Sequence, residues 1–144
     1  MTEKQIRVAV VNHQATFLRL MEQILTGEGY ATTVHSAADD AHGAITRLQP
    51  DVIIVDTWLQ TRDEGWELVQ TLRLDEKTRH IPIILASSDA ERVQERSEQL
   101  SGMKNVLILG KPFDPESLLR SVARVTGTKA NWDAGAQASL DSPK

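Results

Sequence analysis

Four short apolar runs constrain the fold of this chain more than any other feature. They lie at residues 6–11 (interrupted by Arg7), 52–55, 81–86 and 106–109, and each is rich in β-branched residues or leucine. None alternates strictly between apolar and polar residues, as a half-exposed strand does. Continuous apolar runs of this length are typical of strands that are buried on both faces of a parallel sheet.

A fifth, weaker run and three helical patterns lie among these four runs. Residues 30–34 include two threonines and predict a further strand nearer the sheet edge. Apolar residues recur at three- and four-residue spacing over residues 17–25, 38–48 and 66–73, which predicts three helices. The third pattern contains Trp66, which we expect to be half-buried.

Two further helices complete an alternation of strands and helices. Residues 89–100 are charged and offer few apolar anchors, so this helix is expected to pack thinly. Asp114 and Pro115 begin the last helix, as an N-cap and a first-turn proline. Strand and helix therefore alternate five times. This order predicts an α/β fold, a doubly wound five-stranded parallel sheet with helices on both faces.

The length and composition fit one domain followed by a tail. The chain has 144 residues, which is enough for one domain with a substantial core. We assign residues 1–126 to this domain. Residues 127–144 are small and polar except for Trp132 and Leu140, so we predict a disordered polar tail there.

The charge and the cysteine content indicate which binding partners and which cellular compartment to expect. The net charge is −4 and the basic residues are scattered, which argues against direct binding to nucleic acid. The longest apolar stretches are about four residues, far short of a membrane span. There is no cysteine, which fits a reducing compartment. We therefore expect a cytoplasmic protein that contacts neither nucleic acid nor membrane.

Polar side chains follow four of the predicted strands. Asn12 and His13 follow the first strand, Asp56 the third, Ser87 the fourth and Lys111 the fifth. The carboxyl ends of parallel strands meet at one edge of the sheet, so these side chains are expected to converge. A carboxylate can accept a phosphoryl group, a hydroxyl can bond to its oxygens, and an ammonium group can offset its charge.

Three motifs make residues 5–126 resemble the receiver domains of bacterial two-component systems. They are PDVIIVD at residues 50–56, IPIILAS at residues 81–87 and GKPF at residues 110–113. Their order and spacing are those of the family. The resemblance implies a flavodoxin-like fold.

The resemblance also implies a role for each motif residue. Asp56 matches the phosphoaccepting aspartate, Ser87 the switch hydroxyl, and Lys111 the lysine that contacts the acyl phosphate. The peptide between Lys111 and Pro112 resembles the one that is cis in the family.

The metal-binding corner departs from the family pattern. Receiver domains carry two acidic residues after the first strand, where this chain has Asn12 and His13. Mg²⁺ prefers oxygen ligands, whereas an imidazole nitrogen suits zinc, nickel or copper. Asp56, Asn12, His13 and the backbone carbonyl of Trp58 would therefore form only a weak site. We expect Mg²⁺ to bind weakly or not at all, and to add little stability to the domain.

Two smaller departures affect signalling. Ile108 stands three residues before Lys111, where the family often carries tyrosine or phenylalanine, and it cannot act as the usual rotating aromatic switch. In the loop after Asp56, Gly65 lies about one residue later than the family pattern places it.

Two functions remain open from the sequence. The first is a response regulator receiver in a phosphorelay. Its Asp56 takes a phosphoryl group from a histidine kinase or phosphotransfer protein, and it signals through a downstream protein partner. It would be a signalling module rather than a metabolic enzyme.

The alternative is an atypical receiver that works as a phosphorylation-independent interaction module, which Asn12, His13 and Ile108 favour. An unrelated nucleotide-binding enzyme is disfavoured, because no glycine-rich phosphate-binding motif follows the first strand.

Overall fold

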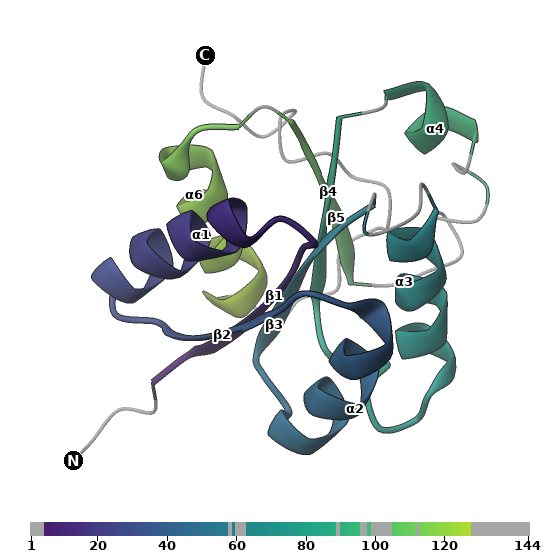
Figure 1. Cartoon of the computed structure of the whole chain (residues 1–144), viewed down its shortest axis with the longest axis horizontal. Helices are drawn as coiled ribbons and strands as arrows, with labels where there is room; N and C mark the ends of the chain where they lie inside the picture. The colour runs from purple at the N-terminus through teal and green to yellow at the C-terminus, as the bar shows by residue number, and fades with distance from the viewer. Residues whose placement is uncertain are drawn as a thin grey trace.

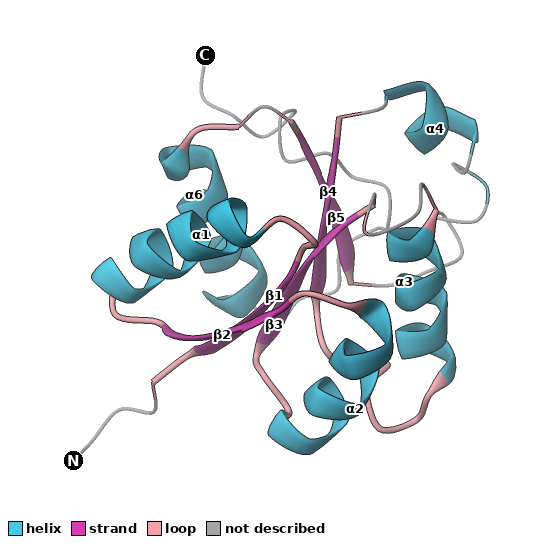
Figure 2. Cartoon of the chain, viewed as in Figure 1, coloured by secondary structure: helices cyan, strands magenta, loops and turns pink. Residues whose placement is uncertain are grey.

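A computed structural model of the protein describes residues 5–57, 59, 63–88, 90–95, 98, 105–111 and 113–127. Its five strands form one parallel sheet in the order β2-β1-β3-β4-β5. The helices cover both faces of this sheet: α1 and α6 lie on one side, and α2, α3 and α4 on the other (Figure 1). Figure 2 shows the strands enclosed between the two helical layers. The predicted doubly wound, five-stranded α/β fold is confirmed.

The strands coincide closely with the apolar runs. They are β1 (Arg7–Val11), β2 (Ala31–His35), β3 (Val52–Asp56), β4 (Ile83–Ser87) and β5 (Val106–Gly110). β2 lies at the edge of the sheet, as its two threonines predicted. Two of its five residues are exposed.

The fourth strand begins two residues later than the apolar run predicted. The backbone N–H of Ile81 donates to the carbonyl of Thr78 in the preceding turn, at 3.0 Å. Pro82 has no N–H to donate to a neighbouring strand. The ladder of β4 therefore starts at Ile83.

The described helices are α1 (Ala15–Gly27), α2 (Ala38–Leu48), α3 (Glu64–Leu74), α4 (Ala90–Glu95) and α6 (Pro115–Gly127). The predicted cap of the last helix is confirmed, since Asp114 Oδ1 accepts the N–H of Ser117 at 2.8 Å. α4 is only six residues long, with Val93 as its buried anchor. Most of the remaining predicted segment at 89–100 lies outside the described residues.

Each face of the sheet has its own apolar core. On one face, Leu18, Met21 and Leu25 of α1 pack with Leu118, Val122 and Val125 of α6 against the sheet. On the other face, residues of α2, α3 and α4 cover the central strands. The expectation that Trp66 is half-buried is wrong: only 2% of its surface is exposed, because it belongs to the wide buried face of α3.

The last element that the structure describes is α6. α6 continues to Gly127, and residues 128–144 lie outside the described residues, so the disordered tail stays a prediction. Among the helices that the structure describes, none is both long enough and apolar enough to span a membrane.

Gly65 allows α3 to begin directly against the end of β3. Its N–H donates to the carbonyl of Thr57 at 3.0 Å. A Cβ at this position would overlap the backbone carbonyl of Asp56 and lie 2.6 Å from the Cα of Thr57. Only glycine fits this approach, so the backbone around Asp56 is packed tightly against the first turn of α3.

Gly65→Ala is therefore expected to destabilise the domain by roughly 1–3 kcal/mol, because backbone must move to admit the methyl group. Urea denaturation measures the change. Gly43→Ala is the matched control. It lies within α2, where a Cβ would meet only Arg47 Nη1 at 3.7 Å. Alanine there is expected to stabilise the domain by about 0.5–1 kcal/mol. Equal effects of the two substitutions would contradict this account of Gly65.

Candidate functional site

The strand register brings the predicted polar residues to one edge of the sheet. Val11 pairs with Val55, Asp56 pairs with Ala86, and Ser87 pairs with Gly110. The residues that follow these pairs therefore leave the sheet at the same level. Asn12, Asp56, Ser87 and Lys111 meet at this edge, as the sequence predicted.

Asp56 is a buried carboxylate that contacts residues at the ends of two other strands. Its exposed fraction is 6%. Lys111 Nζ forms an ion pair with its Oδ2. Asn12 Nδ2 donates to the same oxygen at 2.9 Å. A buried charge is costly unless it is paired and hydrogen-bonded, and these two groups supply that compensation.

Asn12 is held by hydrogen bonds at both ends. Its backbone N–H donates to the carbonyl of His35 at 3.1 Å, and its side-chain Oδ1 accepts the N–H of Gln14 at 2.8 Å. A backbone N–H can only donate and a carboxylate can only accept, so these partners fix which end of the amide is oxygen. The amide nitrogen must point to Asp56.

Lys111 is positioned by its backbone and by an aromatic wall. Its N–H donates to the carbonyl of Ser87 at 2.8 Å. Its Nζ lies 5.2 Å from the ring centroid of Phe17, within the range of a cation–π contact. Phe17 in turn meets Phe113 edge to face, with centroids 6.3 Å apart. The sequence assigned Phe17 only to the apolar face of a helix and missed its contact with the site lysine.

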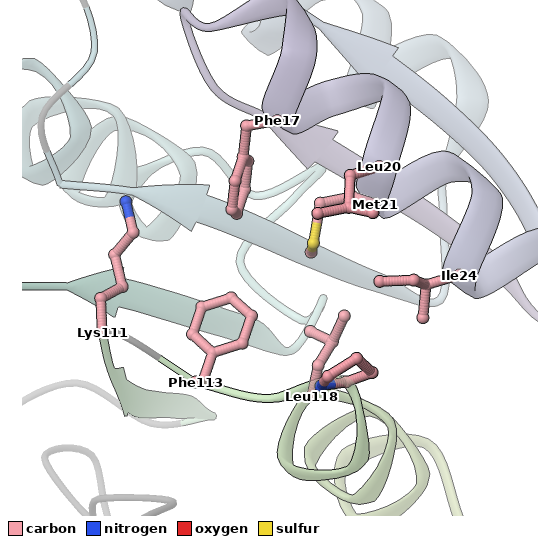
Figure 3. A pocket seen from close by; sticks show the side chains of 8 residues that line it. Phe17, Leu20, Met21, Ile24, Lys111, Phe113 and Leu118 are labelled. Atoms are coloured by element: carbon pink, nitrogen blue, oxygen red, sulfur yellow. The ribbon is translucent and has the colours of Figure 1, made fainter.

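The same two rings border an apolar groove between α1 and α6, shown in Figure 3, with a volume of about 290 Å³. Among the described residues that line it, Lys111 is the one that carries a charge. The other lining residues are Phe17, Leu20, Met21, Ile24, Phe113, Pro115 and Leu118. The groove thus shares Lys111 with the buried Asp56.

Among the described residues, the predicted ligands Asn12, His13 and Asp56 do not converge as a set of cation ligands. Across the described ranges, no group of three or more His, Cys, Asp or Glu side chains is placed to hold a metal ion. Asn12 turns its nitrogen, not its oxygen, toward Asp56. His13 is exposed, whereas Asp56 is buried, and Trp58 lies outside the described residues. The residues present therefore do not fit Mg²⁺, which requires oxygen ligands.

Two of the remaining predicted signalling residues, Ser87 and Ile108, lie on β4 and β5. Ser87 is the last residue of β4 and is 4% exposed. Ile108 is buried in β5 within the core under α3 and α4, so no aromatic ring occupies this position. Pro112 lies outside the described residues, and the cis peptide before it stays a prediction.

His35 contacts the site through its backbone and carries an imidazole whose pKa is shifted. It is the last residue of β2, and its carbonyl accepts the N–H of Asn12. Burial lowers the pKa of its imidazole, as does the positive charge of Arg47, while Asp40 opposes the shift. Folding therefore favours the neutral ring.

Because the folded state has the lower pKa, the stability that His35 contributes is present above its unfolded value of 6.5 and is lost as the pH falls below it. We expect the free energy of unfolding to decrease between about pH 7 and pH 5 more steeply in the wild type than in His35→Gln. Urea denaturation across this range measures both slopes. Identical slopes would rule out this role of His35.

A double-mutant cycle measures the Asp56–Lys111 pair. Lys111→Met leaves a buried carboxylate without its ammonium partner, so this variant should lose more stability than Asp56→Asn combined with Lys111→Met. We expect a coupling energy of about 1–3 kcal/mol from urea denaturation of the four proteins. A coupling near zero would show that the pair does not stabilise the fold.

The fold and this edge together define the class of protein. A 2-1-3-4-5 parallel sheet carries a buried aspartate at the end of its central strand and a lysine after its last strand. The sequence model described as the response regulator receiver domain matches residues 8–123. The chain belongs to this family, whose members are modules of two-component signal transduction.

Individual relatives agree with this assignment. The chain is 24% identical to chemotaxis protein CheY-3 of Vibrio cholerae over 125 residues, covering 85% of this chain and 92% of that protein. It is 29% identical to the phosphate regulon transcriptional regulatory protein PhoB of Pseudomonas aeruginosa, covering 83% of this chain and 52% of PhoB. Among solved structures, it is similar to the receiver domain of sensor histidine kinase PA1611 of Pseudomonas aeruginosa. That match has a TM-score of 0.73 and 27% identity, and covers 87% of this chain and 100% of that one. That structure holds a magnesium ion in its active-site cleft.

Proposed function

We propose that Asp56 accepts a phosphoryl group from a histidine kinase or phosphotransfer protein and that the phosphorylated domain signals to a protein partner. The observation that carries this proposal is the ion pair of Asp56 with Lys111 at the carboxyl edge of the sheet. In the transfer, a carboxylate oxygen of Asp56 forms a bond to phosphorus. The bond from phosphorus to the donor breaks, and its electron pair leaves with the donor.

The surrounding residues fit this transfer. The Lys111 ammonium is placed to offset the charge of the phosphoryl oxygens, as such groups do in phosphoryl transfer. The Ser87 hydroxyl belongs to the end of the next strand, where it would bond to a phosphoryl oxygen. The proposed setting is the cytoplasm, which agrees with the absence of cysteine. A protein rather than nucleic acid is the proposed partner, in keeping with the net charge of −4.

Metal dependence is where we expect this domain to differ from the PA1611 receiver. The Asn12 amide and Lys111 already compensate the charge of Asp56. We therefore propose that Mg²⁺ is bound weakly or not at all and that the ammonium of Lys111 provides the main positive charge during transfer.

Incubation with acetyl phosphate tests the phosphoacceptor. Intact-mass measurement is expected to show one phosphoryl adduct in the wild type and none in Asp56→Ala. Lys111→Met should form the adduct at least ~10-fold more slowly, because it lacks the ammonium that stabilises the developing charge. Asp75→Asn is the matched control, since Asp75 caps the end of α3 outside the site. An adduct that survives in Asp56→Ala would place the acceptor elsewhere.

A second candidate function is a phosphorylation-independent interaction module. Position 108 holds a buried isoleucine. This favours the interaction module, because there is no aromatic ring at this position whose rotation could report the state of Asp56. The two candidates differ in one outcome. If the domain is an interaction module, the wild type and Asp56→Ala should bind the partner with equal affinity. If it is a phosphoreceiver, Asp56→Ala should lose the part of the binding that depends on phosphorylation.

A further inference from the structure

One oxygen of Asp56 connects three strand ends. Its Oδ2 accepts hydrogen bonds from Asn12, which follows β1, and from Lys111, which follows β5. β1 is a direct neighbour of β3, whereas β5 is two strands away on the other side. The carboxylate therefore lies between one neutral donor and one positive donor that approach from opposite halves of the sheet.

One of these two donors, Lys111, carries a charge that offsets the charge of Asp56. Asp56 carries one negative charge and Lys111 one positive charge, and the carboxamide of Asn12 is neutral. The amide also provides a hydrogen bond that a carboxylate at the same position could not donate. Together, these three side chains therefore carry no net charge.

The fixed orientation of Asn12 shows what a carboxylate there would meet. Its Oδ1 would keep the bond from the N–H of Gln14, because that bond needs only an acceptor. Its second oxygen would replace Nδ2, which lies 2.9 Å from Asp56 Oδ2. Two carboxylate oxygens at that separation repel each other unless a proton or a cation lies between them.

We propose that Asn12 sets the metal requirement of this domain: its amide takes the place of a divalent cation beside Asp56, and Asn12→Asp alone converts the domain into one that depends on such a cation for full stability. The inference concerns the same site as the proposed function and rests on Asp56 being its centre. Its test reads folding and cation binding rather than phosphorylation, so either proposal can fail while the other stands.

Thermal unfolding of wild type and Asn12→Asp, with and without millimolar MgCl₂ or MnCl₂, tests this proposal. Sodium chloride at matched ionic strength controls for general screening. The midpoint of the wild type is expected to be the same with and without the cation. Without a cation, the midpoint of Asn12→Asp should lie about 5 °C lower, and added Mg²⁺ should raise it saturably, as binding to the folded state requires. Calorimetric titration with MnCl₂ should detect binding to this variant only.

Two further variants separate charge from the loss of the amide. Asn12→Ala removes the donor without adding charge, so its midpoint should fall and show no response to Mg²⁺. Asn105→Asp makes the same chemical change just before β5, at the opposite edge of the sheet, and should show no response either.

Three results would decide against the proposal. They are a saturable rise of the wild-type midpoint with Mg²⁺, an Asn12→Asp variant that does not respond to the cation, and an equal response in Asn105→Asp. If Asn12→Asp folds only when Mg²⁺ is present, the proposal is supported in its strongest form. If this variant stays unfolded with the cation as well, the proposal is rejected, because a cation was expected to restore it.

Discussion

The burial of one carboxylate at the end of the central strand is the constraint on which the rest of this site depends. β3 is apolar up to Asp56 and covered on both faces, so water cannot solvate the charge that ends it. The polypeptide must supply the compensating groups itself. Parallel strands make this possible, because every strand delivers its last residue to the same edge. The sheet order then places an amide on one side of Asp56 and an ammonium group on the other.

Much of the fold could be predicted, because a strand that is buried on both faces can be recognised from its sequence. A strand covered by helices on both faces needs apolar residues throughout, so β1, β3, β4 and β5 stand out as continuous runs. The errors came from effects that the sequence does not encode locally. The start of β4 depends on a turn that uses the N–H of Ile81. The burial of Trp66 depends on how wide a face α3 presents to the sheet.

The site, too, could be predicted from the sequence only in part. The identity and convergence of Asp56, Ser87 and Lys111 follow from strand ends and motif spacing, which are sequence properties. The orientation of the Asn12 amide does not, because it is set by the backbone N–H of Gln14 and the carboxylate of Asp56. Sequence alone therefore indicated that a metal ligand was missing, but not that its replacement donates a hydrogen bond. The contact of Phe17 with Lys111 likewise joins residues 94 positions apart.

Lys111 belongs to two environments at once. Its ammonium pairs with a buried carboxylate, while the same side chain forms part of the wall of the groove between α1 and α6. A single side chain cannot reorient for one environment without changing the other. The affinity of any molecule that fills this groove and the availability of positive charge at Asp56 are therefore thermodynamically linked, and the linkage acts equally in both directions.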